Sequence, residues 1–187
     1  MLAEVTRFQR KSSSGKNIDV WWLYDAGGLN LLLPYILTTR AQFADCKLRV
    51  FSLANRKDEL DKDTRNMAAL LAKFRIDFSD VVIIPDVTKK AKEETKAEFK
   101  DILDKSRAKV ADTELITNKE KTNRHLRLAE LLREHSSDAE MIMMTLPMPR
   151  KGLSAGLYMA WLEIMTRQMP PFLLVRGNQT SVLTFYS

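Results

Sequence analysis

The chain has 187 residues, of which 45% are hydrophobic and 29% are charged, and its formal net charge at pH 7 is +6. This composition fits one soluble domain with a sizeable core, and no apolar run approaches the roughly 20 residues that a membrane-spanning helix needs. The basic residues are interleaved with acids and not with aromatic residues, which excludes the usual nucleic-acid-binding patterns, and a lone cysteine, Cys46, excludes an internal disulfide and favours a reducing compartment.

The N-terminal part of the chain predicts a flexible lead-in, a strand, a turn and a helix. Residues 1–16 are polar, contain the linker-like run KSSSGK and lack the apolar core of a secretory signal. Residues 18–24 are rich in branched and aromatic side chains, which is typical of a strand. Gly27 and Gly28 then break the strand, and residues 29–39 predict a helix.

A second strand, a second helix and a third strand follow. Residues 46–54 alternate between polar and apolar side chains before they become apolar, which predicts a strand. Residues 58–74 place their apolar side chains on one helical face. Residues 80–86 form a short branched apolar run that ends at Pro85, so we expect a third strand there.

Residues 87–117 interrupt this alternation of strands and helices. They are rich in lysine and glutamate, and their apolar content is thin, with Phe99, Ile102 and Leu103 as one weak stripe. We interpret them as an insertion that is partly helical and partly disordered. Regulatory kinases could modify hydroxyl groups in such a segment, at Thr88, Thr95, Ser106 and Thr113.

The last part of the chain returns to the earlier pattern. Residues 118–135 predict a helix, and residues 139–147 are apolar enough for a strand that is covered on both sides. The next helix runs to about residue 168 after Ser154, which is a good N-cap residue. Two strands complete the chain at 172–177 and 181–186.

Strands that alternate with helices predict an α/β fold with a three-layer, doubly wound, mostly parallel sheet. We expect the strand order 3-2-1-4-5, numbered along the chain, with the sixth strand antiparallel at the edge. The predicted organisation is a lead-in over residues 1–16 and a single domain over residues 17–187 that contains the insertion.

Ligands of doubly wound sheets bind beyond the carboxyl ends of the strands, where the winding reverses. Two glycines, two cations and a helix N-terminus meet at that place in the predicted fold, which would suit a nucleotide phosphate or another anion. The candidate residues are Gly27, Gly28, Arg150, Lys151 and Gly152. The dinucleotide and phosphate-loop glycine patterns are both absent. We therefore favour the interpretation that the first two glycines only make a tight turn.

No catalytic or metal-binding set is visible in the sequence. His125 and His135 stand ten residues apart on one predicted helix, and there is no second cysteine. The serine-hydrolase elbow is also absent. We expect neither enzymatic activity nor a cofactor or a metal.

Blocks of the sequence resemble a known family in the order in which that family has them. They are IDVWWLYDAGGLNLLLPYILTT, CKLRVF, LLAKFRIDFSDVVII, RLAELLREHS, LPMPRKG, LYMAWLE and PPFLLVRGNQTSVLTFYS. Together they resemble the cytosolic C-terminal domain of cation-chloride cotransporters, in the sodium-dependent branch, and most closely that of the sodium-potassium-chloride cotransporters. The resemblance covers about residues 17–187, but residues 89–116 match poorly.

The resemblance implies a non-enzymatic regulatory and dimerisation domain of a membrane symporter for sodium, potassium and chloride. The domain would lie at the cytoplasmic face of the plasma membrane. Its partners would be a second copy, its own membrane domain and the preceding half of the C-terminal region, with regulatory kinases as further partners and no nucleic acid. The fold would be universal-stress-protein-like or Rossmann-like, and a nucleotide-sensing module of that type is the alternative function.

Overall fold

The computed structural model forms two compact units. The first unit draws on residues 1–85, 138–146 and 170–187, and the second on residues 86–137 and 147–169. The residues that the structure describes are 17–23, 28–53, 60–73, 75–85, 87–106, 109–178, 180 and 182. The predicted lead-in over residues 1–16 lies outside them, and the single domain over residues 17–187 stays a prediction.

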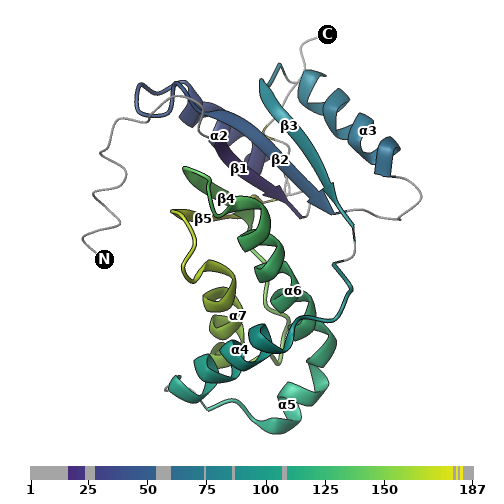
Figure 1. Ribbon diagram of the computed structural model, residues 1–187, viewed down its shortest axis with the longest axis vertical. Coiled ribbons are helices and arrows are strands. Elements are labelled where there is room, and N and C mark those ends of the chain that lie inside the picture. Colours follow the sequence, from purple (N-terminus) through teal and green to yellow (C-terminus); the bar gives the residue numbers. More distant parts are fainter. Residues whose placement is uncertain are drawn as a thin grey trace. The chain divides into compact units, whose positions relative to one another are not determined.

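A five-stranded sheet forms the centre of the first unit (Figure 1). Its order is β3-β2-β1-β4-β5, and each of the four neighbouring pairs is parallel. The predicted order of the first five strands is therefore confirmed. The strand bounds are Asn17–Trp22 for β1, Lys47–Leu53 for β2, Phe78–Ile84 for β3, Met141–Thr145 for β4 and Phe172–Val175 for β5.

No antiparallel edge strand is seen among the described residues, although one was predicted at 181–186. Apart from Val182, those residues lie outside the described part of the chain, and Val182 itself is not in a strand. The sheet that the described residues form is parallel throughout.

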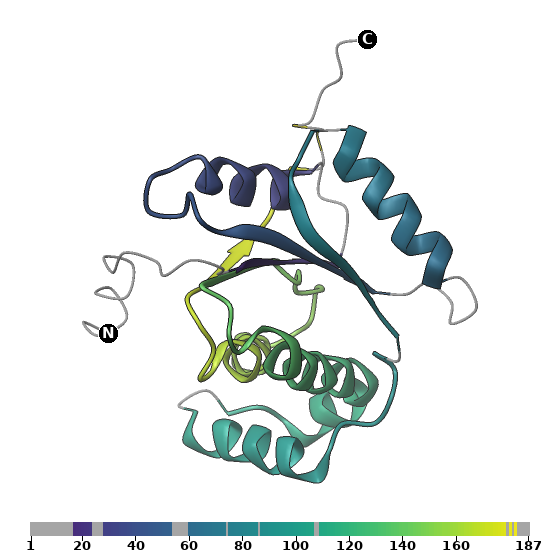
Figure 2. The same cartoon turned by 45° about the horizontal axis from the view of Figure 1, so that its top comes forward.

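Two helices cover one face of this sheet, α2 (Leu29–Thr38) and α3 (Leu60–Lys73). Figure 2 shows both on the same side of the strands. Successive strand residues point to opposite faces, so every second residue of β1, β2 and β4 reaches this layer. The buried cluster there consists of Ile18, Val20, Leu31, Phe43, Cys46, Leu48, Val50, Leu71, Ile76, Met141 and Met143.

The opposite face of the sheet carries a stacked aromatic pair and an ion pair. Trp21 and Phe51 are neighbours in the register of β1 and β2, and their rings stack with centroids 4.7 Å apart. Both side chains are buried. Asp19 and Arg49 are also partners in this register, and they lie on the same face two residues before Trp21 and Phe51.

The second unit is helical, and it contains the predicted insertion. Its helices are α4 (Glu93–Lys105), α5 (Asp112–Thr117), α6 (Lys119–Ser136) and α7 (Ala155–Thr166). Helices α4 and α5 both lie within residues 87–117, and the interpretation of this segment as an insertion stays a prediction. The described residues of the insertion also pack: Phe99 and Ile102 are buried, as is Thr95, which makes that threonine a poor kinase target.

Polar side chains of α6 hold the segment that leads into α4. The Asn123 amide accepts a hydrogen bond from the Ala91 N–H and donates one to the Lys89 carbonyl, both at 2.9 Å. Glu130 accepts from the Lys92 N–H at 2.7 Å. These contacts place the start of α4 although its own N-cap residue, Lys92, makes no side-chain cap.

Arg133 joins three helices of this unit. Its guanidinium donates to both carboxylate oxygens of Glu98 on α4, at 2.8 and 3.0 Å, and to the Ile164 carbonyl on α7 at 3.3 Å. Such a bidentate pair fixes geometry as well as charge.

Candidate functional site

The first candidate site lies in the sheet unit, where the strand order reverses between β1 and β4. This is the topological switch point of a doubly wound sheet. Helix α2 begins here after Gly28, whose φ of +80° is left-handed, and the Gly28 carbonyl accepts from the Leu31 and Leu32 N–H groups at 3.0 Å each. The interpretation of Gly28 as a turn residue agrees with this geometry, while Gly27 lies outside the described residues.

Asn30 and Thr145 are two switch-point residues that the sequence reasoning missed. Each is 2% exposed, and the Asn30 amide nitrogen donates to the Thr145 hydroxyl, which joins α2 to the carboxyl end of β4. The amide oxygen of Asn30 is buried, and no described residue donates a hydrogen bond to it. A buried acceptor of that kind costs free energy unless a donor reaches it, so polar chemistry at this switch point centres on Asn30.

The other predicted site residues belong to the helical unit. Arg150, Lys151 and Gly152 are exposed in a turn that the Leu153 N–H closes on the Arg150 carbonyl at 3.2 Å. Gly152 has a φ of +86°, and a Cβ built on it meets nothing within 4 Å. This glycine therefore serves the backbone conformation and not a close approach.

The N-terminus of α7 already carries an acid of the chain itself. Ser154 is the N-cap, and its hydroxyl accepts from the Leu157 N–H at 3.2 Å. The Ser154 N–H donates to a carboxylate oxygen of Glu114 at 2.6 Å. Helix N-termini favour anions, and here Glu114 of α5 supplies one. Sequence reasoning missed Glu114 because it stands 40 residues earlier, in the segment interpreted as an insertion.

The predicted anion site thus draws on residues of both units. Gly28 lies in the sheet unit, and Arg150, Lys151 and Gly152 lie in the helical unit. The site that would combine them stays a prediction.

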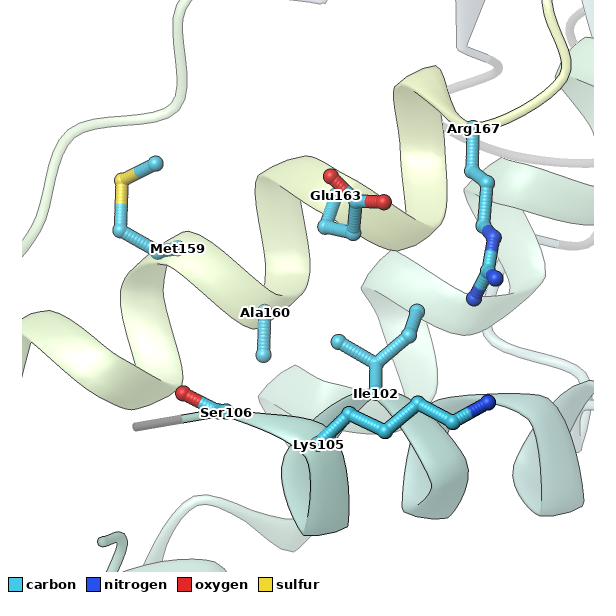
Figure 3. A pocket seen from close by; sticks show the side chains of 7 residues that line it. All are labelled: Ile102, Lys105, Ser106, Met159, Ala160, Glu163 and Arg167. Atoms are coloured by element: carbon cyan, nitrogen blue, oxygen red, sulfur yellow. The ribbon is translucent and has the colours of Figure 1, made fainter. Parts of the chain in front are cut away.

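A pocket of about 300 Å³ lies between α4 and α7 (Figure 3). Its lining combines apolar groups with one acid and two cations: Ile102, Lys105, Ser106, Met159, Ala160, Glu163 and Arg167. Lys105 is paired with Asp101 at 2.7 Å. Ser106 supplies the one hydroxyl of this lining, which contains neither a histidine nor a cysteine. The lining therefore offers no nucleophile paired with a base and does not support catalysis of that kind.

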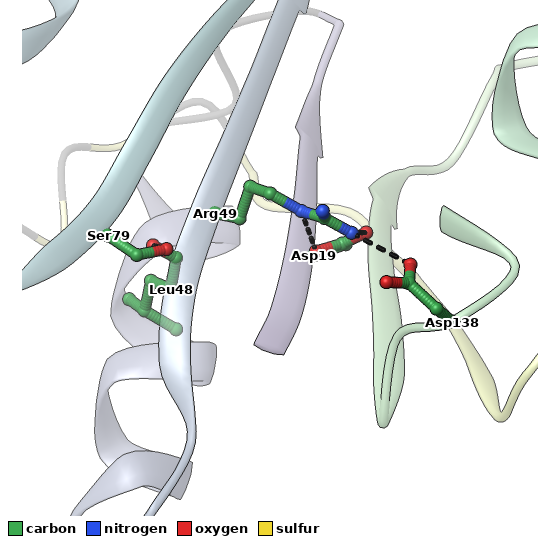
Figure 4. Close-up of polar contacts among 5 residues, drawn as sticks. All are labelled: Asp19, Leu48, Arg49, Ser79 and Asp138. Carbon is green, nitrogen blue, oxygen red and sulfur yellow. Dashed lines mark hydrogen bonds and ion pairs between the residues drawn. The ribbon is translucent and has the colours of Figure 1, made fainter. Parts of the chain in front are cut away.

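An ion pair crosses the sheet on the face that carries Trp21 (Figure 4). Arg49 donates to both carboxylate oxygens of Asp19, at 2.9 and 2.8 Å, and to Asp138 at 3.1 Å. Asp19 is fully buried, whereas the Asp138 side chain is 74% exposed. The hydrogen bond to Asp19 raises the pKa of Arg49 above its ordinary value. A guanidinium held so firmly charged is a structural cation and not a proton donor.

Glu130 is the corresponding buried acid of the helical unit. Besides the Lys92 N–H, it accepts from the Arg127 guanidinium at 2.7 Å. Burial raises its pKa, but hydrogen bonds from Arg127, Lys92 and Thr95 outweigh burial, so the pKa lies below its ordinary value. The carboxylate therefore stays charged.

His125 is the third group with an altered pKa. Its ring stacks on Trp161 with centroids 4.4 Å apart, and its Nδ1 lies 2.8 Å from the Lys121 carbonyl. Burial lowers the pKa of His125, and the Lys121 carbonyl opposes that effect only in part. The folded chain thus holds a neutral imidazole that donates through Nδ1–H.

We expect a pH dependence of stability from His125. Because its folded pKa lies below its unfolded value of about 6.5, the unfolded chain takes up the proton first. The free energy of unfolding is then unaffected by His125 above pH about 6.5 and falls as the pH drops below that value towards the folded pKa. Urea unfolding of the chain between neutral and mildly acidic pH measures the loss.

The His125→Phe variant, which keeps a ring against Trp161, is expected to lack this part of the pH dependence. His135→Gln on the same helix is the matched control and should retain it. An unchanged pH profile in His125→Phe would show that His125 does not cause the dependence.

The described residues contain no group of three or more histidine, cysteine, aspartate or glutamate side chains that could hold a metal ion. None of the described helices is long and apolar enough to span a bilayer.

The whole chain, residues 1–187, matches the family model described as solute carrier family 12. It is 55% identical over 194 residues to a bumetanide-sensitive sodium-(potassium)-chloride cotransporter of Manduca sexta. It is 48% identical over 208 residues to solute carrier family 12 member 2 of Homo sapiens, and 45% identical over 201 residues to member 1 of Rattus norvegicus.

These matches cover 100%, 100% and 97% of the chain respectively, but only 18%, 17% and 18% of the relatives. The chain therefore spans less than a fifth of the length of the curated relatives that it matches.

Proposed function

Because the chain belongs to solute carrier family 12, we propose that it is the regulatory and dimerisation domain of a membrane symporter for sodium, potassium and chloride. The domain lies on the cytoplasmic side of the membrane and carries out no transport and no catalysis itself. Its relatives are cotransporters and not enzymes.

One observation carries this proposal above the others. Identity of 45–55% extends over nearly the whole chain, yet the chain spans less than a fifth of each relative. No described helix could cross a bilayer. Because the match covers so small a share of each relative, we assign the transport step to the remaining four-fifths of such a protein.

The sheet supports the finer description of the fold that the resemblance implies. A parallel order of 3-2-1-4-5 is that of a doubly wound fold, and we propose the three-layer, universal-stress-protein-like arrangement for it. The partners are a second copy of the chain, the membrane domain of the same protein and the preceding half of its C-terminal region.

Self-association tests the dimerisation part of this proposal. We expect the sedimentation coefficient of the purified chain to rise from the monomer towards the dimer value across a concentration series. An apolar side chain at the sheet edge supports this expectation, since Leu173 on the edge strand β5 is 42% exposed. A constant monomer value up to the solubility limit would contradict dimerisation by this chain alone.

A nucleotide-sensing module is the second candidate function. It is favoured by the switch point, where Gly28 begins a helix without a side-chain cap and the Asn30 amide oxygen has no donor among the described residues. It is disfavoured by Glu114, which already places a carboxylate on the N-terminus of α7. Calorimetric titration with ATP and AMP decides this question, and no heat at millimolar nucleotide would end the second candidate.

A further inference from the structure

We propose that Ser154 is a phosphorylation site, and that a phosphate on it displaces Glu114 from the N-terminus of α7 and releases α5. The inference goes beyond the proposed function, because it concerns a contact within this chain and requires neither a dimer nor a membrane domain. Three features of the helical unit carry it: the contact itself, the weak attachment of α5 and the basic approach to Ser154.

The contact brings an acid onto the residue that would be modified. The Ser154 N–H donates to Glu114 at 2.6 Å, and the Ser154 hydroxyl accepts from the Leu157 N–H at 3.2 Å. A phosphoserine carries a charge of about −1.5 to −2 at pH 7. Phosphate and Glu114 would then share one helix N-terminus, and α7 has no acid of its own in its first turn.

The phosphate is favoured over Glu114 in this competition for two reasons. It is attached to the N-cap residue itself, so it occupies the terminus without any cost of bringing two segments together. It also bears the larger negative charge at the positive end of the helix dipole. Repulsion between the two anions then acts on Glu114, which is the partner that can leave.

Besides its continuation into α6 through Asn118, whose backbone and side chain both donate to the Glu114 carbonyl at 3.0 Å, helix α5 has few contacts among the described residues. It is six residues long, and none of its side chains is buried. The Ile116 side chain is 73% exposed. Short elements with few buried contacts open most easily, so the Glu114 contact has a large share in fixing α5, and its loss is felt there first.

The approach to Ser154 is basic and open. Arg150 and Lys151 precede it by four and three residues, and both are exposed. Residues 146–154 contain no helix or strand, and space surrounds Gly152 at the turn. An irregular exposed segment with cations just before a half-exposed serine suits a protein kinase whose substrate groove is acidic.

The reaction is an ordinary phosphoryl transfer with ATP as the co-reactant. The Ser154 hydroxyl oxygen forms a bond to the γ-phosphorus, the bond from that phosphorus to the β–γ bridging oxygen breaks, and ADP leaves. The hydroxyl proton passes to the catalytic base of the kinase. Arg150 and Lys151, which precede Ser154 by four and three residues in the chain, are exposed cations of the kind that pairs with a phosphate dianion.

The switch is tested on the purified chain with phosphoserine incorporated genetically at position 154. Hydrogen exchange of amides 112–118 is expected to become at least about ten-fold faster than in the unmodified chain, the change that loss of one charge-assisted hydrogen bond produces. Glu114→Ala should reproduce the faster exchange without phosphate, and phosphoserine should add nothing further to it. Glu120→Ala, which removes an exposed acid nearby on α6, is the matched control and should behave like the unmodified chain.

The modification itself is tested with ATP and the catalytic subunit of a basophilic kinase, followed by mass spectrometry. Phosphate is expected on Ser154, and the Arg150→Ala/Lys151→Ala variant should lose most of it while its exchange response to encoded phosphoserine persists. Unchanged exchange in the phosphoserine chain would overturn the switch. Absence of phosphate at Ser154 after treatment with a panel of basophilic kinases would overturn the site, and neither result bears on dimerisation.

Discussion

The Arg49→Met variant is expected to lose about 3–5 kcal/mol of unfolding free energy, the usual cost of removing one member of a buried ion pair. Asp19 is fully buried, and Arg49 donates to both of its carboxylate oxygens. Methionine keeps much of the side-chain volume over the Phe51 ring, which the guanidinium now overlies at 5.3 Å. The effect therefore reports the charge and not a cavity. Urea unfolding at neutral pH measures it.

Asp138→Asn is the matched control for this variant, because it removes the other acid from the same guanidinium. The Asp138 side chain is 74% exposed, so its pair should be worth less than about 1 kcal/mol. If Arg49→Met and Asp138→Asn lost the same amount of unfolding free energy, burial of Asp19 would not explain the loss in Arg49→Met.

The second large effect is expected at Glu130. The Glu130→Ala variant should lose about 3–5 kcal/mol of unfolding free energy, since it leaves Arg127 mostly buried without its acid. The Arg127 side chain is only 16% exposed, and within the described part of the chain its Nε already has no hydrogen-bond acceptor. The same change removes the acceptor of the Lys92 N–H. The variant should therefore show a larger increase in hydrogen-exchange rate at the start of α4 than in α6.

The controls for Glu130 separate charge from position. Glu130→Gln keeps an acceptor for Lys92 but loses the charge, so its loss should be smaller than that of Glu130→Ala. Glu134→Gln changes an exposed acid four residues further along the same helix and should stay within about 0.5 kcal/mol of the parent chain. An equal loss at Glu134 would mean that net charge, and not the Arg127 contact, controls stability here.

The order of the sheet could be predicted because its signals are local. Branched and aromatic runs such as residues 18–24 mark buried parallel strands whatever they pack against, and the handedness of the crossovers limits how they can be arranged. All five strands begin and end within about two residues of the predicted bounds, and β4 is two residues shorter than predicted at each end.

The packing of the insertion could not be predicted from such local signals. Its apolar stripe is thin, and what positions it is polar and distant: Asn123 and Glu130 contact residues 32 to 38 positions earlier. A hydrogen bond over that separation leaves no periodicity in the sequence. Composition alone therefore makes the segment look less ordered than its described residues are.

The switch-point chemistry was missed for the same reason. Asn30 and Thr145 lie 115 residues apart, and neither belongs to a glycine or metal-ligand motif. The one available signal was a polar residue within the apolar run LNLLLPYILT. The role of Gly28 was easier to predict from the sequence, because a left-handed backbone favours glycine.

Chloride uptake by the full-length protein shows whether this segment regulates and dimerises a transporter. Cells would express the protein intact or without the segment equivalent to this chain, with surface amount and oligomeric state measured in parallel. If the segment is a regulatory and dimerisation domain, its removal lowers the dimer fraction and abolishes the response of uptake to cellular signals per protein at the surface. Unchanged dimerisation and unchanged regulated uptake after removal would contradict the account.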